Sequence, residues 1–195
     1  MSGPRRVEVE PARLPRWLDG VRERHGDLAW TGGPHDPSFE IVAADGTHIV
    51  GERFDHDPLG LLLVRRGGWA VGRAEGGALP AHTTGTKYVQ SRTAAGGWSQ
   101  QRFARRRANQ ADALVLALVE PAIRHLSDAP LGALVVGGDK ALVASLLTVF
   151  ADEARLRPLL ALPRRELYDL PDPRLKVLQD AAHRGRAVRL AITDP

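Results

Sequence analysis

Hydrophobic residues recur at helical spacing in four parts of the chain, and these parts are the predicted helices. In residues 11–25, Leu14, Trp17, Leu18 and Val21 follow at intervals of three and four, and Gly26 is expected to end the helix. A longer helix is predicted over residues 102–126, where Pro121 should kink it or divide it. Two more are predicted over residues 140–150 and 173–184.

Alternating or continuous hydrophobic runs predict the strands. Residues 39–43 and 47–50 flank an Asp-Gly pair that suits a hairpin turn, and residues 59–65 and 69–73 form a second hairpin. Further strands are predicted over 85–92, 131–136, 157–163 and 187–192. Hairpins come first and strand–helix alternation follows. This order predicts an α/β or α+β fold, in which helices flank a mixed sheet. We expect residues 1–10 to be a flexible lead-in and residues 11–195 to form a single domain.

Composition narrows the function classes. The chain has no cysteine, which excludes thiolate zinc sites, disulfide scaffolds and cysteine nucleophiles. Its net charge is +4 and its pI about 10.1, because most of its bases are arginines, which do not lose their proton. The N-terminus lacks the apolar core of a signal peptide, and no run approaches the ~20 apolar residues that span a bilayer. We therefore expect a cytoplasmic protein without a membrane partner. We see no coiled-coil pattern and expect a monomer.

Two short motifs have both a chemical and a structural interpretation. "GGDK", residues 137–140, could cradle a phosphate at a helix start, but a tight turn with Asp139 beside the helix N-terminus explains it better. "FDHDP", residues 54–58, offers Asp55, His56 and Asp57 as metal ligands, and with Asp139 these would suit a metal-dependent nuclease. Neighbouring residues on a strand point to opposite faces, so a polar turn is the better interpretation.

The densest charge follows a glycine-rich segment in "TAAGGWSQQRFARRRANQ", residues 93–110. Gly96 and Gly97 allow the backbone to approach a partner closely. Glutamine cannot act as a general base, but its amide can orient a water molecule and stabilise charge in a transition state. Arginines directly behind it can bind phosphates. These residues suit an enzyme whose active site is completed by a nucleic acid, although a surface loop leading to a basic helix has the same composition.

The stretch "GGWSQQRFARRR" resembles the catalytic segment of the middle domain of eukaryotic and archaeal class I release factors, in which a GGQ tripeptide precedes a helix with an RFAR-like run. It is more similar to the VLRF-type release-factor-like peptidyl-tRNA hydrolases, in particular to a single-domain actinobacterial branch. "KYVQSR", residues 87–92, and "RRRANQADALV", residues 105–115, extend the likeness. The resemblance implies a release-factor middle-domain-like fold and hydrolysis of the ester between a nascent peptide and tRNA. Its setting would be the peptidyl-transferase centre of stalled or obstructed large ribosomal subunits, for ribosome rescue and quality control, without a metal or another cofactor.

The resemblance also implies roles for individual residues. Gly96, Gly97 and a glutamine would carry the chemistry, and Arg102, Arg105, Arg106 and Arg107 would contact rRNA or tRNA. Where release factors have the glutamine, this chain has Trp98, so the catalytic amide would be Gln100 or, as second choice, Gln101. Trp98 could stack on a base or anchor the loop to the domain. The alternative function is a non-catalytic rRNA- or tRNA-binding module that uses the same arginines and Trp98.

Overall fold

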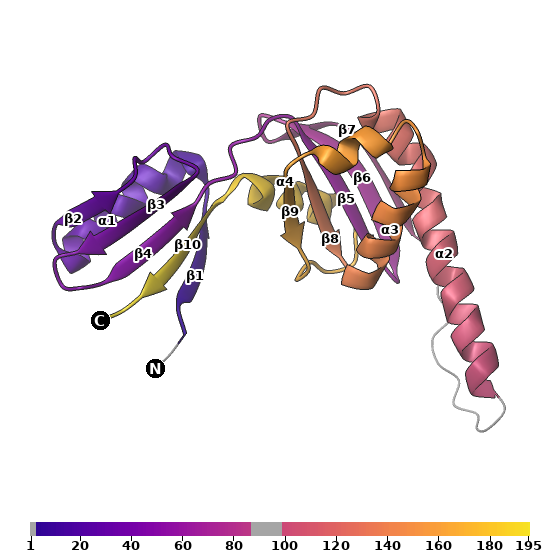
Figure 1. The fold of residues 1–195 in the computed structure, drawn as a ribbon, viewed down its shortest axis with the longest axis horizontal. Helices are drawn as coiled ribbons and strands as arrows, with labels where there is room; N and C mark the ends of the chain where they lie inside the picture. Colours follow the sequence, from indigo (N-terminus) through magenta and orange to yellow (C-terminus); the bar gives the residue numbers. More distant parts are fainter. Residues whose placement is uncertain (1–2, 87–98) are drawn as a thin grey trace. The chain divides into compact units, whose positions relative to one another are not determined.

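The chain folds into two compact units, each with its own sheet. The computed structural model describes the backbone of residues 3–86 and 99–195, and the side chains of residues 3–86 and 112–195. Unit 1 comprises Met1–His56 and His183–Pro195, and unit 2 comprises Asp57–Ala182 (Figure 1). The two units together contain four α-helices, one antiparallel sheet and one mixed sheet in the described residues, and this confirms the predicted α+β class. The single domain expected over residues 11–195 is instead divided, because two separate sheets each bury their own hydrophobic cluster.

Unit 1 is a five-stranded antiparallel sheet covered on one face by a helix. Its strand order is β1-β10-β4-β3-β2. The strands are β1 (Arg5–Val9), β2 (Leu28–Thr31), β3 (Ser38–Ala43), β4 (His48–Glu52) and β10 (Val188–Thr193). Helix α1 (Leu14–His25) follows the short 3-10 helix η1 (Pro11–Arg13). Strand β10 lies between β1 and β4, so the last strand of the chain completes a sheet that the first four begin.

The hydrophobic pattern of unit 1 explains this packing. Alternate residues of β3 and β4, including Phe39, Ile41 and Ile49, are buried against Leu14 and Val21 of α1. Period-two alternation places these side chains on one face of the sheet, and helical spacing places their partners on one face of α1. The core of unit 1 is therefore the layer between α1 and one sheet face.

Two predicted turns of unit 1 are confirmed. Gly26 follows α1 with a φ of 83°, which glycine adopts without strain. Gly46 has a φ of 92° in the β3–β4 hairpin, where Asp45 accepts a hydrogen bond from the Thr47 backbone N–H at 2.9 Å. That bond and the neighbouring His25 lower the pKa of Asp45 to about 2.

The expected flexible lead-in, residues 1–10, contains a strand instead. Arg5–Val9 forms β1 and pairs with β10 in continuous register, from Arg5 opposite Ile192 to Val9 opposite Val188. The Glu8 carboxylate holds two arginines of the C-terminal segment, with Arg184 Nε at 2.7 Å and Arg189 Nε at 3.4 Å. The prediction failed because the partner of this short strand lies at the far end of the sequence, where no local pattern reveals it.

Unit 2 has a mixed five-stranded sheet with the order β7-β6-β5-β8-β9. Its strands are β5 (Leu59–Arg65), β6 (Gly68–Glu75), β7 (Ala78–Thr86), β8 (Ala133–Gly138) and β9 (Arg164–Leu167). Strands β5, β6 and β7 are antiparallel neighbours, whereas β5, β8 and β9 run parallel. Helices α2 (Ser99–Leu126) and α3 (Lys140–Asp152) pack on one face (Figure 1).

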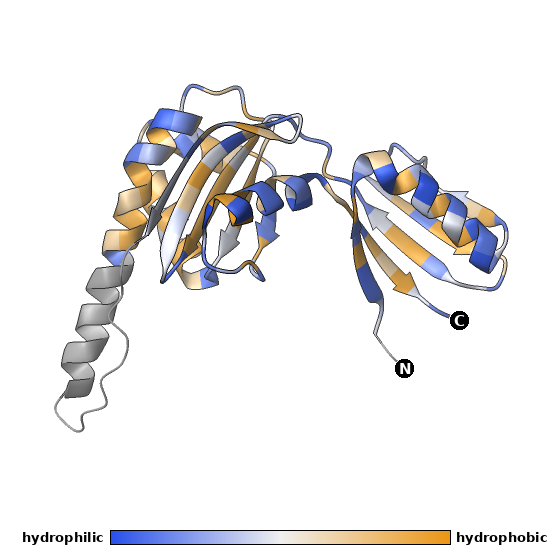
Figure 2. Cartoon of the chain, turned by 180° about the vertical axis from the view of Figure 1, so that it is seen from behind, coloured by the Kyte–Doolittle hydropathy of each residue, from blue (hydrophilic) through white to orange (hydrophobic). Residues whose placement is uncertain are grey.

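Both faces of the unit 2 sheet are covered in its centre. Val136 of β8 contributes to the layer beneath α2 and α3, whereas Leu178 of α4 (Leu175–Arg186) lies close to Gly72 of β6 on the opposite face. The central strands β5 and β8 are consequently buried along almost their whole length, as expected of strands covered on both faces. Hydrophobic residues gather on these strands and on the helix turns that face them (Figure 2).

Two predicted elements of unit 2 differ from the structure, and a third lies mostly outside the described residues. Helix α2 runs through Pro121 without a break, because the buried residues on both sides of it hold the helix on the sheet. Residues 157–163, predicted as a strand, contain the 3-10 helix η2 (Arg157–Ala161) instead, since Pro158 favours the first turn of a helix. The strand predicted over 85–92 meets β7 only at its first two residues, and positions 87–92 lie outside the described residues.

Candidate functional site

The predicted catalytic segment runs from beyond an edge strand into the first turns of a long helix of unit 2. Strand β7 ends at Thr86, and α2 begins at Ser99. Gly96, Gly97 and Trp98 lie outside the described residues. Gln100 and Gln101 fall in the first turn of α2, and Arg102, Arg105, Arg106 and Arg107 follow in its next two turns, but the side chains of all six lie outside the described part of the chain. The structure therefore describes the two elements that hold this segment, β7 and α2, which are called its supports here.

The strand that leads into the segment is held by an aromatic ring. Trp69 of β6 lies directly opposite Gly85 of β7. A Cβ atom on Gly85 would lie only 2.6 Å from the indole Nε1 of Trp69, so the ring occupies the space above the glycine. The next pair is Gly68 and Thr86, where a Cβ on Gly68 would lie 2.5 Å from the Gly85 carbonyl oxygen. Only glycine permits this close approach, and it fixes the last residues of β7.

The helix on the other side of the segment is anchored by its C-terminal half. Leu114, Leu118, Ala122 and Leu126 recur every four residues on α2 and are each no more than 1% exposed. Leu118, Ala122 and Leu126 share one hydrophobic cluster with residues of β5, β6 and α3. On the outer side, Leu116 is 60% exposed. Helix α2 is thus fixed from residue 114 onward, and its N-terminal turns continue past this buried contact (Figure 1).

A hydrogen bond connects the two supports to each other. The Thr83 hydroxyl on β7 and Nε2 of His125 on α2 lie 2.7 Å apart. Burial lowers the pKa of His125, and the nearby guanidinium of Arg124 lowers it further. The neutral imidazole is therefore favoured at this contact, which fixes the C-terminal end of α2 to the strand that leads into the segment.

The "GGDK" turn is a structural turn, as favoured from the sequence. Gly138 ends β8 with a φ of 103°, and Asp139 is the N-cap of α3. The Asp139 Oδ1 atom accepts hydrogen bonds from the backbone N–H groups of Ala141 and Leu142, at 3.0 and 3.2 Å. Because these amides are already paired with a carboxylate, they are not available to an incoming phosphate.

The "FDHDP" residues do not converge on a metal site. Asp55 faces Arg53 at 3.3 Å, and the His56 ring packs edge-on against Phe54. Asp57 accepts a hydrogen bond from the Gly76 backbone N–H at 3.1 Å. Across the part of the chain that the structure describes, no group of three His, Asp or Glu side chains is placed to hold a metal ion. The polar-turn interpretation is the one that fits these contacts.

Positive charge is concentrated in unit 2. Unit 1 contains ten Arg and eleven Asp or Glu residues, whereas unit 2 contains seventeen Lys or Arg and twelve Asp or Glu. Residues 87–111 contain six of these bases and no acidic residue. Among the described helices, none is long and apolar enough to cross a membrane. The excess of positive charge in unit 2 therefore comes mainly from the candidate segment between β7 and the middle of α2.

A family model matches most of the chain. Residues 57–191 match the model described as the Actinobacteria/chloroflexi VLRF1 release factor. No curated protein matches the chain. The matched range begins at the first residue of unit 2 and includes the whole candidate segment with its flanking strand and helix.

Proposed function

Because the chain belongs to the Actinobacteria/chloroflexi VLRF1 release factor family, we propose that it is a peptidyl-tRNA hydrolase that frees nascent peptides on stalled or obstructed large ribosomal subunits. The observation that carries this proposal is the segment that leads from β7 into the first turns of α2. There, Gly96-Gly97 and two glutamines directly precede a run of arginines, without an acidic residue from 87 to 111. Both supports of this segment are anchored in the core of unit 2.

The proposed reaction is hydrolysis of the ester that joins the peptide to the terminal adenosine of tRNA. A water oxygen bonds to the ester carbonyl carbon, the bond to the tRNA 3′ oxygen breaks, and that oxygen leaves with a proton. An amide cannot accept the proton of the attacking water, so Gln100 orients the water and stabilises the developing oxyanion by hydrogen bonding. Surrounding RNA groups or solvent carry the proton to the leaving oxygen.

The arginines supply binding rather than chemistry in this proposal. Arg102, Arg105, Arg106 and Arg107 fall within six consecutive positions near the start of α2, so they bring four positive charges to that part of the chain. Guanidinium groups bind phosphate oxygens in a bidentate manner and do not lose their charge. They would hold the start of α2 among rRNA and tRNA phosphates, and the site would be cytoplasmic, where ribosomes work.

One observation favours the alternative function. Trp98 occupies the position at which release factors carry the glutamine, directly after the glycine pair. A tryptophan there can stack on a base, which contributes roughly 1–3 kcal/mol to binding but no catalysis. A non-catalytic rRNA- or tRNA-binding module would therefore use the same arginines and Trp98 without ester hydrolysis.

The test is peptide release from purified large ribosomal subunits that carry labelled peptidyl-tRNA. Wild type, Gln100→Ala and Gln101→Ala are compared, with Gln179→Ala as the matched control, because Gln179 is an exposed glutamine on α4. We expect Gln100→Ala alone to lose release while it still sediments with the subunits. Loss in Gln101→Ala alone would move the catalytic role by one residue. Subunit binding by wild type without any release would favour the binding module.

A further inference from the structure

One face of the unit 1 sheet is left open by the described residues of that unit. Helix α1 covers the face that carries Phe39, Ile41 and Ile49. The alternate residues of β2, β3 and β4 point to the other side, and Val42 and Val50 are 47% and 39% exposed there. We call the outward residues of these three strands the open face. They include Thr31, Glu40, Val42, His48, Val50 and Glu52.

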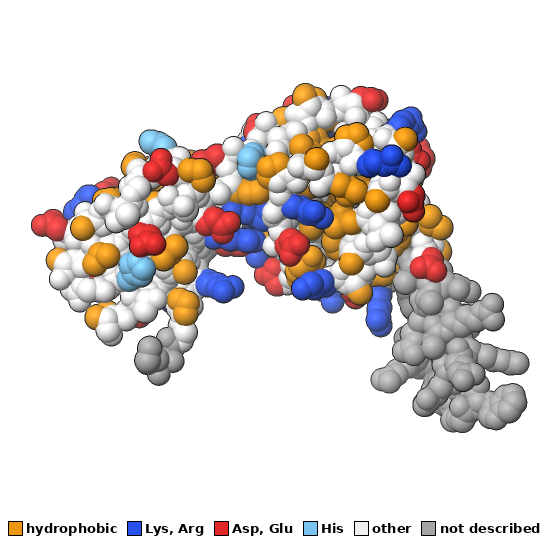
Figure 3. Space-filling model, viewed as in Figure 1, with side chains coloured by type: hydrophobic (Ala, Val, Ile, Leu, Met, Phe, Trp, Pro, Cys, Tyr) orange, Lys and Arg blue, Asp and Glu red, His pale blue; other side chains and the backbone are white. Residues whose placement is uncertain are grey.

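The open face mixes apolar and acidic side chains. Val50 lies opposite Glu40, and Val42 lies opposite His48. The Glu40 carboxylate is 3.4 Å from His48 Nε2, and its side chain is still 56% exposed. Figure 3 shows hydrophobic, acidic and histidine side chains interspersed on this part of unit 1. An exposed valine pair beside a carboxylate suits a contact that is apolar in its centre and charged at its edge.

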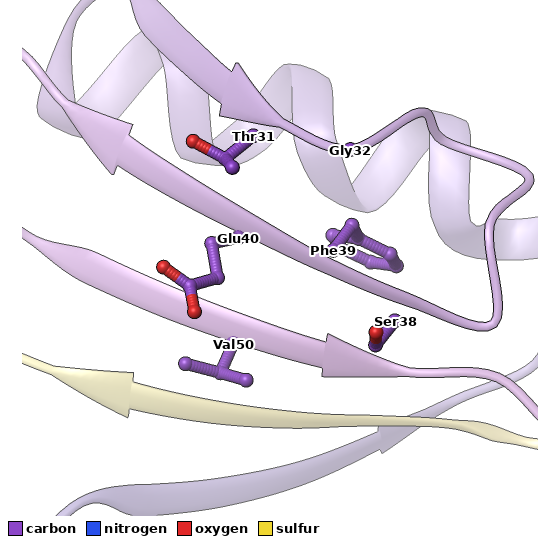
Figure 4. A pocket seen from close by; sticks show the side chains of 6 residues that line it. All are labelled: Thr31, Gly32, Ser38, Phe39, Glu40 and Val50. Carbon is purple, nitrogen blue, oxygen red and sulfur yellow. The ribbon is translucent and has the colours of Figure 1, made fainter.

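The open face contains a shallow depression. It lies where β2 ends beside β3, so that the chain leaves the sheet and exposes the neighbouring strand. Thr31, Glu40 and Val50 project from three neighbouring strands on the side away from α1 (Figure 4). Its lining residues are Thr31, Gly32, Ser38, Phe39, Glu40 and Val50. The charged group in it is the Glu40 carboxylate, which would attract a cation at the end of an aliphatic chain.

Charge favours a protein over a nucleic acid as the partner of this face. The outward positions of β2, β3 and β4 include Glu40 and Glu52 but no lysine or arginine. The neighbouring strands β10 and β1 add Arg189, which lies opposite Glu52, together with Arg6 and Glu8. The Glu8 carboxylate lies 3.4 Å from Arg189 Nε, so Glu40 and Glu52 are the carboxylates left for a partner. Nucleic-acid binding depends on cations that replace the counterions of phosphates, and carboxylates repel them. Unit 1 as a whole has ten Arg against eleven Asp or Glu. Its first 56 residues also precede the family match, which begins at residue 57.

We infer that the open face docks a lysine- or arginine-bearing protein segment of the large ribosomal subunit. The aliphatic stems of such side chains would cover Val42 and Val50, and their charged ends would reach Glu40 and Glu52. The inference rests on the proposed function for the subunit as the place of binding. It assigns unit 1 a protein partner, whereas the arginines of α2 would contact RNA.

Site-specific photo-cross-linking tests this inference. Val42 is replaced by p-benzoylphenylalanine in the full chain, and the protein is irradiated with purified large ribosomal subunits that carry labelled peptidyl-tRNA. The control carries the same residue at Glu23, which is exposed on α1 of the same unit. We expect position 42, and not position 23, to cross-link to a subunit protein. Cross-links from position 42 to rRNA, to unit 2 or to a second copy of the chain would overturn the inference.

Charge reversal gives an independent measurement. Glu40→Lys with Glu52→Lys should weaken subunit binding by about tenfold. The control, Asp19→Lys with Glu23→Lys, changes the charge of α1 equally and should leave binding within about twofold of wild type. Equal weakening in both pairs would show a general charge effect and overturn the inference.

The two experiments distinguish failure of the inference from failure of the proposed function. If wild type binds the subunits and releases peptide while position 42 cross-links to no subunit protein, only the inference fails. If wild type does not bind the subunits, the proposed function fails with it.

Discussion

The hydroxyl oxygen of Thr83 and Nε2 of His125 lie 2.7 Å apart, so a hydrogen bond joins the strand before the candidate segment to the helix after it. Trp69 holds the same strand by covering Gly85. Both contacts lie on the face of the sheet that packs against α2. Under the proposed function, two fixed ends would help to place the candidate segment accurately against its RNA partner.

The pH dependence of stability should report the Thr83–His125 contact. Burial lowers the pKa of His125 below its ordinary value of about 6.5, so the folded state binds a proton less readily than the unfolded state. The stabilisation is therefore present above pH 6.5 and is lost as the pH falls below it. Urea unfolding of wild type and His125→Gln from pH 8 to pH 5 should show a stability difference that shifts against wild type at low pH. The control is His35→Gln, in an exposed loop. A pH-independent difference for His125→Gln would contradict this interpretation.

Gly85→Ala should destabilise unit 2 because its methyl group would collide with the Trp69 ring. Overpacking of this kind costs roughly 1–3 kcal/mol. Trp69→Leu in the same chain should relieve the collision, so the double variant should be more stable than the sum of the two single changes predicts. Additive destabilisation, measured by urea unfolding, would show that the ring and the glycine do not interact.

Two glycines of unit 1 should respond to alanine in opposite directions. The Phe39 ring covers Gly51, where a Cβ would lie 2.6 Å from Phe39 Cε1, so Gly51→Ala should cost roughly 1–3 kcal/mol. Gly20 lies within α1, and the nearest heavy atom to its Cβ position is Arg24 Nη2 at 4.0 Å. Gly20→Ala should therefore stabilise the protein by about 0.5–1 kcal/mol, because alanine favours the helix. Thermal unfolding distinguishes the two, and a common sign would refute the packing argument.

The salt dependence of subunit binding should identify the arginines that bind phosphate. Replacing Arg105, Arg106 and Arg107 by Gln should reduce the slope of log K against log salt by roughly 0.7–0.9 for each phosphate that the variant no longer neutralises. The matched control replaces the exposed arginines Arg16, Arg22 and Arg24 of α1 by Gln, which gives the same change of charge on another helix. Equal changes of slope would assign the effect to net charge rather than to phosphate binding by α2.

Local patterns predicted much of the fold. Helix α1 and Gly26, the hairpin at Asp45-Gly46, the strand 59–65 and most of β8 follow from spacing and turn chemistry over short distances. Strand β1 and the division into two units could not be predicted, because β1 pairs with residues at the other end of the chain. The Trp69–Gly85 contact was also hidden, since it depends on the register between β6 and β7.

The candidate site was predictable to a different extent. The segment, its glycines and its arginines could be recognised in the sequence, and the family match over residues 57–191 confirms the resemblance. The supports, Thr83 with His125 and Trp69 with Gly85, carry no sequence signal of their own, because threonine, histidine and glycine are common in the strands and helices of many proteins. A helix start placed between 99 and 102 could not be fixed by periodicity, since the residues there are polar.

We propose above all that a glutamine amide at the start of α2 orients the water molecule that hydrolyses peptidyl-tRNA. The most direct test of this claim is single-turnover release of labelled peptide from large subunits by the Gln100→Ala, Gln101→Ala double variant, at concentrations that saturate binding. Removal of a transition-state hydrogen bond predicts a rate lower than that of wild type by about 10²-fold or more, with unchanged binding to the subunits. A release rate within about twofold of wild type would contradict the claim.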